Sequence, residues 1–249
     1  MSLFDFHGMM AYSEAGVTII NGDSSELCVM KEFSGKADAI ITDPPYKLTS
    51  GGRNRGGDGK HKTMSGIFSG ENYDNSGLLM EVPSWGEVSS VITSIAGPNA
   101  EAYVMANDKN IFEAQAALAG DKWKLHNLLV WDKSHPIPNR WYMKHLEFVL
   151  YMWKGKARGI NNKGHKQLSS EKRTAEEAKV HPTQKPISLM MRYIENSTDV
   201  GDTVFDPYAG SGSTLIAAAL SGRNAVGFEK SEERFGDAVS NIRHHLNIR

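Results

Sequence analysis

The chain has 249 residues, 40% of them hydrophobic, which is enough to bury the core of one large domain. It lacks a run of about 18 apolar residues and a basic, apolar leader, so we expect neither a membrane span nor a signal peptide. Its single cysteine, Cys28, excludes an internal disulfide, is expected to pack as a small core residue, and suits a reducing cytoplasm.

The net charge of −1 conceals two strongly basic segments. Residues 122–180 carry thirteen Lys and Arg against five Asp and Glu, and residues 47–62 carry five against one. The rest of the chain is therefore acidic. Two basic segments in such a protein indicate a face turned toward a polyanion, although solvated loops could have the same composition.

Apolar runs of strand length alternate with segments of helical spacing along the chain. We expect a short helix after Gly22-Asp23, strands at 17–21, 37–42, 101–107, 203–206 and 224–229, a hairpin-like pair at 126–133 and 146–154, and helices at 85–96, 109–120, 186–197, 213–222 and 232–246. The glycine-rich, polar residues 49–75 predict a mobile loop, and 155–180 show no apolar pattern. The alternation predicts a mainly parallel α/β sheet with helices on both faces.

The strand at 37–42 runs directly into Asp43-Pro44-Pro45-Tyr46. Two consecutive prolines fix two φ angles and remove two backbone donors, so the turn is stiff and leaves its carbonyl groups free to point elsewhere. Open α/β sheets bind ligands at the carboxyl ends of their strands. We therefore expect Asp43 and Tyr46 to serve a ligand rather than only to end the strand.

Residues 204–229 form a second unit of strand, glycine turn, helix, strand and acid. Gly210 and Gly212 permit a tight turn before a helix N-terminus, and Glu229 ends the next strand, where a carboxylate can bind a ribose diol. The turn lacks the lysine of a P-loop, and Leu215 stands where a dinucleotide turn has a small residue. S-adenosylmethionine fits better, because it has a ribose and no pyrophosphate and because Asp206 suits its cationic methionine part.

Three motifs in this order resemble the amino-methyltransferases of DNA, in the permuted beta group whose catalytic motif precedes the cofactor motif. Asp43-Pro44-Pro45-Tyr46 resembles the catalytic tetrapeptide, and 181–186 (HPTQKP) resembles the signature before the cofactor strand. Residues 206–212 (DPYAGSG) are similar to the cofactor loop, with Tyr208 where Phe is usual. Gly22-Asp23, VWDK and KHLEFVLY resemble further strands of the family, so the likeness spans residues 17–246.

The resemblance implies one methyltransferase domain over residues 1–249. Its fold would be a Rossmann-like, seven-stranded, mostly parallel sheet with permuted motif order, with the Asp206 strand central and the Asp43 strand beside it. The glycine-rich segment 49–75 would be a flexible basic loop that orders over DNA. Target recognition would fall to a short insert at 155–180.

The resemblance also assigns roles to residues. Asp43 and the Pro44 carbonyl would accept the two N–H groups of the target amine, Pro45 would stiffen the turn, and Tyr46 would stack on the flipped base. Lys185 is expected near the methionine end of the cofactor, although it could instead pair with an acid at a helix start. The expected cofactor contacts are Asp23, Thr183, Lys185, Asp206, Pro207, Tyr208, Gly210, Ser211, Gly212 and Glu229. The candidates for contacts to DNA phosphates are Arg53, Arg55, Lys60, Lys62, Arg140, Lys144, Lys163, Lys166 and Arg173.

The function that follows is site-specific methylation of adenine N6 in double-stranded DNA, with S-adenosylmethionine as cofactor and without a metal. N4 methylation of cytosine, methylation of RNA or of a protein amide, and a non-catalytic nucleic-acid-binding module with the same fold are the alternatives. In this family Asp at the head of the tetrapeptide favours adenine. The resemblance leaves open a homodimer, a cognate restriction nuclease, and a phage or solitary role.

Overall fold

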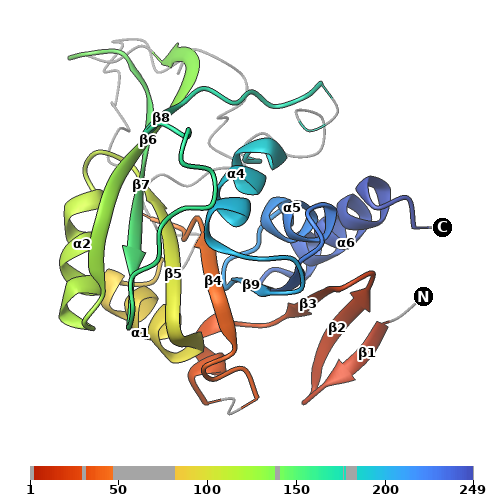
Figure 1. Ribbon diagram of the computed structural model, residues 1–249. Helices are drawn as coiled ribbons and strands as arrows, with labels where there is room; N and C mark the ends of the chain where they lie inside the picture. Colours follow the sequence, from red (N-terminus) through yellow and green to blue (C-terminus); the bar gives the residue numbers. More distant parts are fainter. Residues whose placement is uncertain are drawn as a thin grey trace, which may run out of the picture.

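The computed structural model describes residues 3–29, 32–46, 82–137, 141–175, 177 and 184–248. Within these ranges the chain forms one sheet in the spatial order β1-β2-β3-β10-β9-β4-β5-β7-β6-β8 (Figure 1). The strands are β1 (Leu3–Phe6), β2 (Met9–Glu14), β3 (Val17–Asn21), β4 (Ala37–Thr42), β5 (Ala96–Ala106), β6 (Lys124–Ile137), β7 (Lys144–Trp153), β8 (Leu168–Ser169), β9 (Thr203–Asp206) and β10 (Asn224–Glu229).

The centre of the sheet confirms the predicted class. Strands β3, β10, β9, β4 and β5 are parallel neighbours, and β7 lies antiparallel between β5 and β6. These seven strands place β4 in the middle with β9 beside it; the two are neighbours as expected, although the Asp206 strand was expected to be the central one. The described sheet has ten strands rather than seven, because the β1–β2 hairpin extends it beyond β3 and the two-residue β8 pairs with β6. Neither addition has the buried alternation that reveals a strand in sequence.

Helices cover both faces of the sheet, as Figure 1 shows. The helices are η1 (Ser24–Val29, a 3-10 helix), α1 (Trp85–Ile95), α2 (Ile111–Gly120), α4 (Ile187–Ser197), α5 (Ser213–Leu220) and α6 (Glu232–His245). Successive strand residues face opposite sides, so Ile40 packs in the core under α1 and α2, while Ile41 packs under α4, α5 and α6. No helix within the described ranges combines the length and apolar character that a membrane crossing needs.

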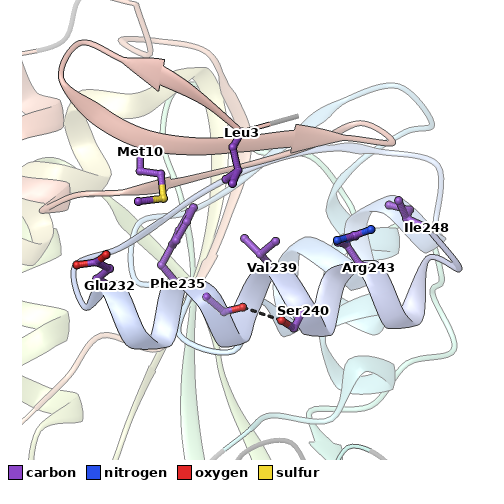
Figure 2. Close-up of a pocket in the computed structure, with 9 residues that line it drawn as sticks. Leu3, Met10, Glu232, Phe235, Val239, Ser240, Arg243 and Ile248 are labelled. Atoms are coloured by element: carbon purple, nitrogen blue, oxygen red, sulfur yellow. Dashed lines mark hydrogen bonds between the residues drawn. The ribbon is translucent and has the colours of Figure 1, made fainter. Parts of the chain in front are cut away.

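The N-terminal hairpin β1–β2 lies next to helix α6 at one edge of the sheet. Figure 2 shows Leu3 and Met10 of the hairpin facing Phe235 and Val239 of α6 across an open groove. Phe235 is buried, whereas Leu3 and Met10 are 42% and 43% exposed. The groove therefore closes only at its base, and it lies at the β1 edge rather than beside the motifs that follow β4 and β9.

Of the two segments without an apolar pattern, the predicted loop and the predicted target-recognition insert, the structure describes most of the second. Residues 49–75 lie outside the described part of the chain. Residues 155–175 are described. They run along α4, and hydrogen bonds attach them to it. The Asn161 side chain donates to the backbone oxygens of Glu195 and Thr198, and Arg192 of α4 donates to Lys166 O at 2.9 Å. Polar side chains rather than an apolar pattern hold this segment, which is why its sequence resembles a loop.

Candidate active site

The Pro-Pro turn lies at the carboxyl end of β4, in the middle of the sheet. β4 is almost wholly buried, and Pro44 is buried directly after it. Tyr46 lies beside Trp85 at the start of α1, with ring centroids 6.5 Å apart and planes 21° apart. A buried strand and a stiff turn therefore hold Asp43 between them at the sheet edge where open α/β folds bind ligands.

A row of alternating charges runs from Asp43 across the sheet edge. Lys185, just before α4, forms an ion pair with Asp43 Oδ2, and its Nζ lies 3.3 Å from Glu147 Oε2 on β7. Glu147 in turn accepts a hydrogen bond of 3.0 Å from Lys133 on β6. The Lys185 side chain is 12% exposed and that of Glu147 is 15% exposed, so water screens this row only weakly.

The two oxygens of Asp43 have different surroundings. Oδ2 is occupied by Lys185, whereas Oδ1 is buried and has no hydrogen-bond partner among the described residues. Burial raises the pKa of the Asp43 carboxyl; Lys185 opposes this rise and Glu147 adds to it. For Lys185, burial lowers the pKa, but Asp43 and Glu147 outweigh burial and carry it well above its ordinary value. One acceptor oxygen is thus free beside a firmly charged ammonium.

Asp206, the last residue of β9, joins the catalytic turn to the glycine turn. The Thr42 hydroxyl donates to Asp206 Oδ1 at 2.7 Å, and the Tyr208 backbone N–H donates to the same oxygen at 3.1 Å. Asp206 is 4% exposed, and burial raises its pKa to about 6, against hydrogen bonds that lower it. The structure therefore places Asp206 as a buried link between the two turns and brings the Asp43 motif beside the cofactor motif.

The glycine turn between β9 and α5 has the tight geometry that its sequence predicts. Gly210 and Gly212 have φ values of +51° and +80°, in the left-handed region that favours glycine. The Gly210 N–H donates to Glu229 Oε2 at 3.1 Å, and the Ser231 N–H donates to Glu229 Oε1 at 2.9 Å. Burial raises the pKa of Glu229, while these N–H groups and Arg234 oppose it.

Asp23 lies at the end of the neighbouring strand. The Gly22 N–H donates to Glu229 O at 3.1 Å, which sets the β3 end against the β10 end. Asp23 accepts from the Ser25 N–H and pairs with Lys230 Nζ at 2.9 Å, and these groups outweigh burial and lower its pKa. Asp23 and Glu229 are both partly exposed. Two accessible carboxylates beside a glycine turn fit a ligand with hydroxyl groups and a cationic end.

The structure brings most predicted site residues to one sheet edge, but not all of them. Asp43, Lys185, Asp206, Gly210 and Glu229 lie at or beside the ends of the central strands. Lys163, Lys166 and Arg173 are exposed on the segment along α4, and Lys144 pairs with Asp108 at 2.8 Å. The predicted residues Arg53, Arg55, Lys60, Lys62, Arg140 and Thr183 lie outside the described part of the chain.

Sequence reasoning did not single out Glu147 and Lys133 as site residues. Both lie on the β6–β7 pair, which is more than 80 residues from Asp43 in the chain. Glu147 is a charged residue in the otherwise apolar stretch LEFVLYMW, which is the signal that could have revealed it. Its partner Lys185 was expected near the methionine end of the cofactor or paired with an acid, and the structure pairs it with Asp43.

Comparison with known proteins identifies related enzymes. A family model described as DNA methylase (N6_N4_Mtase) matches residues 37–240. The chain is 29% identical to the type II methyltransferase M2.DpnII of Streptococcus pneumoniae, over 89% of this chain and 88% of that protein. It is 28% identical to M2.LlaDCHI of Lactococcus lactis subsp. cremoris, over 89% and 87%. The solved complex of M1.HpyAVI with S-adenosylmethionine superposes with a TM-score of 0.66 at 25% identity, covering 90% of this chain and 98% of that one.

Proposed function

The chain belongs to the DNA methylase family, and from the geometry of its site we propose that it methylates the N6 amine of an adenine flipped out of duplex DNA. S-adenosylmethionine supplies the methyl group from its sulfonium, and the neutral thioether that remains is a good leaving group. The observation that carries the proposal is that Asp43 Oδ1 has no hydrogen-bond partner among the described residues. Thr42, the residue before Asp43, is hydrogen-bonded to Asp206 at the start of the glycine turn.

The residues of the Pro-Pro turn account for the activation of a weak nucleophile. The lone pair of an exocyclic amine is delocalised into the ring. Asp43 Oδ1 and the Pro44 carbonyl each accept one N–H of that amine, which favours a tetrahedral nitrogen with an exposed lone pair. Positive charge then develops on the nitrogen, and acceptors held in advance stabilise it. The buried Pro44 holds its own carbonyl in place.

The target base must leave the duplex to reach this pocket, at a cost of a few kcal/mol. Tyr46 offers an aromatic face at the same turn, and stacking of about 1–3 kcal/mol per base offsets part of that cost. A cytosine N4 amine could use the same acceptors. Asp43 at the head of the tetrapeptide supports adenine, because the resemblance associates Asp there with adenine.

The proposed cofactor contacts group by position. Asp23 and Glu229 would hold the adenosine hydroxyls, and the glycine turn would accept the methionine part close to its backbone. Asp206, which is buried, would act by fixing that turn to β4. Thr183, Pro207, Tyr208 and Ser211 are proposed contacts of the same site.

DNA would approach over the exposed basic residues of the segment along α4. Lys163, Lys166 and Arg173 are exposed there, and their charges suit phosphate oxygens. We keep Lys144, Arg140 and the four basic residues of 49–75 as further proposed contacts. The relatives are named type II methyltransferases, which supports a cognate restriction nuclease as partner. A homodimer is also proposed, and light scattering tests it.

Mass spectrometry of nucleosides tests the function. Unmethylated duplex DNA is incubated with S-adenosylmethionine and the parent, Asp43→Ala, or Asp237→Asn, which removes an exposed carboxyl on α6 as a control. We expect N6-methyladenine from the parent and the control, and a loss of at least about 100-fold in D43A. An equally active D43A contradicts the assignment.

Other products separate the alternatives. N4-methylcytosine keeps the mechanism and changes the base. Cofactor binding without any methylated DNA redirects the search to RNA or protein, and DNA binding without cofactor binding supports the non-catalytic module.

A further inference from the structure

Lys185 touches the carboxylate that the proposed chemistry uses. Its ammonium pairs with Asp43 Oδ2 and lies 3.3 Å from Glu147 Oε2. An ammonium has three donors and no acceptor. One of them donates to Asp43 Oδ2, while Glu147 Oε2 attracts the charge at 3.3 Å without a hydrogen bond. The side chain is only 12% exposed. If it reoriented, Asp43 Oδ2 would lose its described donor and Glu147 would keep only Lys133.

The ion pair with Lys185 gives the two carboxylate oxygens of Asp43 different roles. Oδ2 is committed to Lys185, and Oδ1 has no hydrogen-bond partner among the described residues. The carboxylate plane is thereby oriented from one side, with its free oxygen left for a donor from outside the protein. Glu147, held by Lys133 at 3.0 Å, anchors Lys185 from β7. Residues from β6, β7, the start of α4 and the end of β4 thus form one row of alternating charge.

We propose that Lys185 is a positioning residue for methyl transfer: by occupying Asp43 Oδ2 it keeps Asp43 ionised and presents Oδ1 to the N–H of the target amine, with Glu147 as its anchor. The inference rests on the proposed role of Asp43. It assigns Lys185 to the catalytic carboxylate and not to the methionine end of the cofactor, where the sequence motif placed it. It also gives a role to Glu147 and Lys133.

The bonds that change define what Asp43 must do. The amine lone pair forms the N–C bond while the C–S electron pair leaves with the sulfur, so positive charge moves from sulfur to the nitrogen. One N–H proton then leaves through Asp43 Oδ1 and passes to solvent. A methylated aminium is a strong acid, so even a carboxylate whose basicity Lys185 has reduced can accept its proton. Asp43 must be ionised before the step, and Lys185 maintains that state.

The charges around Asp43 make the proposal testable by pH. Lys185 favours the ionised form, Glu147 opposes it, and Lys133 favours it from further away. Among the residues that the structure describes, Asp206 on β9 and Tyr46 in the same turn also face this pair. Removing the Lys185 charge should raise the pKa of Asp43, and removing the Glu147 charge should lower it. A residue needed only for folding would not produce opposite shifts.

The experiment measures kcat/KM for DNA methylation against pH in the parent, Lys185→Met, Lys185→Arg and Glu147→Gln, with Lys36→Met as a control at the opposite end of β4. We expect kcat/KM of K185M to fall at least about tenfold at neutral pH. The acid limb of its pH profile should move to higher pH by about one unit or more. The acid limb of the E147Q profile should move to lower pH. K185R should keep the parent limb, and K36M should match the parent throughout.

Cofactor affinity and a measurement without turnover complete the test. By calorimetry, K185M should bind S-adenosylmethionine within about threefold of the parent, a difference under about 0.7 kcal/mol. An affinity loss above tenfold with an unmoved acid limb would overturn the proposal and return Lys185 to the cofactor. If the parent methylates no DNA, the proposed function fails on its own. Carboxyl 13C NMR, with the Asp43 signal assigned by Asp43→Asn, then decides whether K185M raises the Asp43 pKa; an unchanged pKa also overturns the proposal.

Discussion

Asp206 carries a buried carboxylate that two neighbouring strands share. Oδ1 accepts from the Thr42 hydroxyl and the Tyr208 N–H, and the Thr214 side chain also hydrogen-bonds to the carboxylate. Burial raises its pKa from 3.8 to about 6, so ionising it in the folded protein is unfavourable. This unfavourable ionisation occurs where the catalytic turn and the glycine turn meet. Asn would keep the Oδ1 acceptor and remove the charge.

The substitution Asp206→Asn should therefore change how stability depends on pH. Between about pH 4 and pH 6 the folded parent retains a proton that the unfolded chain has lost, so the free energy of unfolding falls as pH rises. A shift of about two units corresponds to about 2 kcal/mol lost by the parent relative to D206N on going from pH 4 to pH 7. Urea denaturation of the cofactor-free proteins measures it.

The exposed-carboxyl variant Asp237→Asn gives the baseline for removing one charge from the same protein. A difference between D206N and the parent that stays constant from pH 4 to pH 7 contradicts the raised pKa of Asp206.

At the scale of elements, buried strands were predictable and exposed ones were not. The expected bounds of the strands at 17–21, 37–42, 203–206 and 224–229 agree with β3, β4, β9 and β10. These are short apolar runs between turn residues. β5 begins at Ala96 rather than Glu101, because Gly97 and Pro98 interrupt the apolar pattern although the backbone still pairs. β1 is mostly exposed and carries no burial pattern to detect.

Some residues of the site were also predictable from the sequence, and others were not. Asp43 with its prolines, and Gly210 with Gly212, were predictable because each motif is contiguous in the chain and has its own turn chemistry. The ion pair between Lys185 and Asp43 joins residues 142 positions apart, and Glu147 reaches them only through the pairing of β7 with β5. Such contacts depend on strand order, which no local pattern encodes.

Gly227 makes the contact between β10 and α5 possible. A Cβ atom there would lie 2.8 Å from Leu215 Cδ1 and 3.0 Å from Ala209 Cβ. Leu215 is fully buried and the Ala209 methyl cannot rotate away. We expect Gly227→Ala to lower the free energy of unfolding by about 1–3 kcal/mol through overpacking. Chemical denaturation measures it.

The matched control is Gly236→Ala in α6, where an added Cβ meets nothing within 4 Å. Because alanine favours helix more than glycine does, that change should be neutral or stabilising by up to about 1 kcal/mol. If G227A proves as stable as G236A, then α5 does not pack on β10 as closely as the structure shows.

At the scale of the whole molecule, a basic segment lies along the helix that begins next to the site. The net charge is −1, yet residues 122–180 carry an excess of Lys and Arg. Figure 1 shows the trace that follows β7 running along α4, whose start holds Lys185. The hydrogen bonds from Asn161 and Arg192 attach this segment to α4. The exposed Lys163 and Lys166 thereby lie beside the C-terminal half of the helix that Lys185 directly precedes.

This arrangement predicts a particular dependence of DNA binding on salt. Each phosphate contact releases about 0.9 counterion from duplex DNA, so the slope of log K against log salt counts the contacts. Replacing the exposed Lys163 and Lys166 by Gln should reduce that slope by about 2 and weaken binding to all sequences alike. Fluorescence anisotropy between about 50 and 200 mM KCl measures it.

The control separates contact from net charge. Lys36→Gln with Lys122→Gln removes the same two charges from exposed positions just before β4 and β6, outside the segment along α4. If phosphates bind along α4, only the K163Q/K166Q pair changes the slope, because counterion release counts contacts rather than net charge. Equal slopes for the two pairs mean that DNA is attracted by the overall field alone, and the segment along α4 then loses its proposed role.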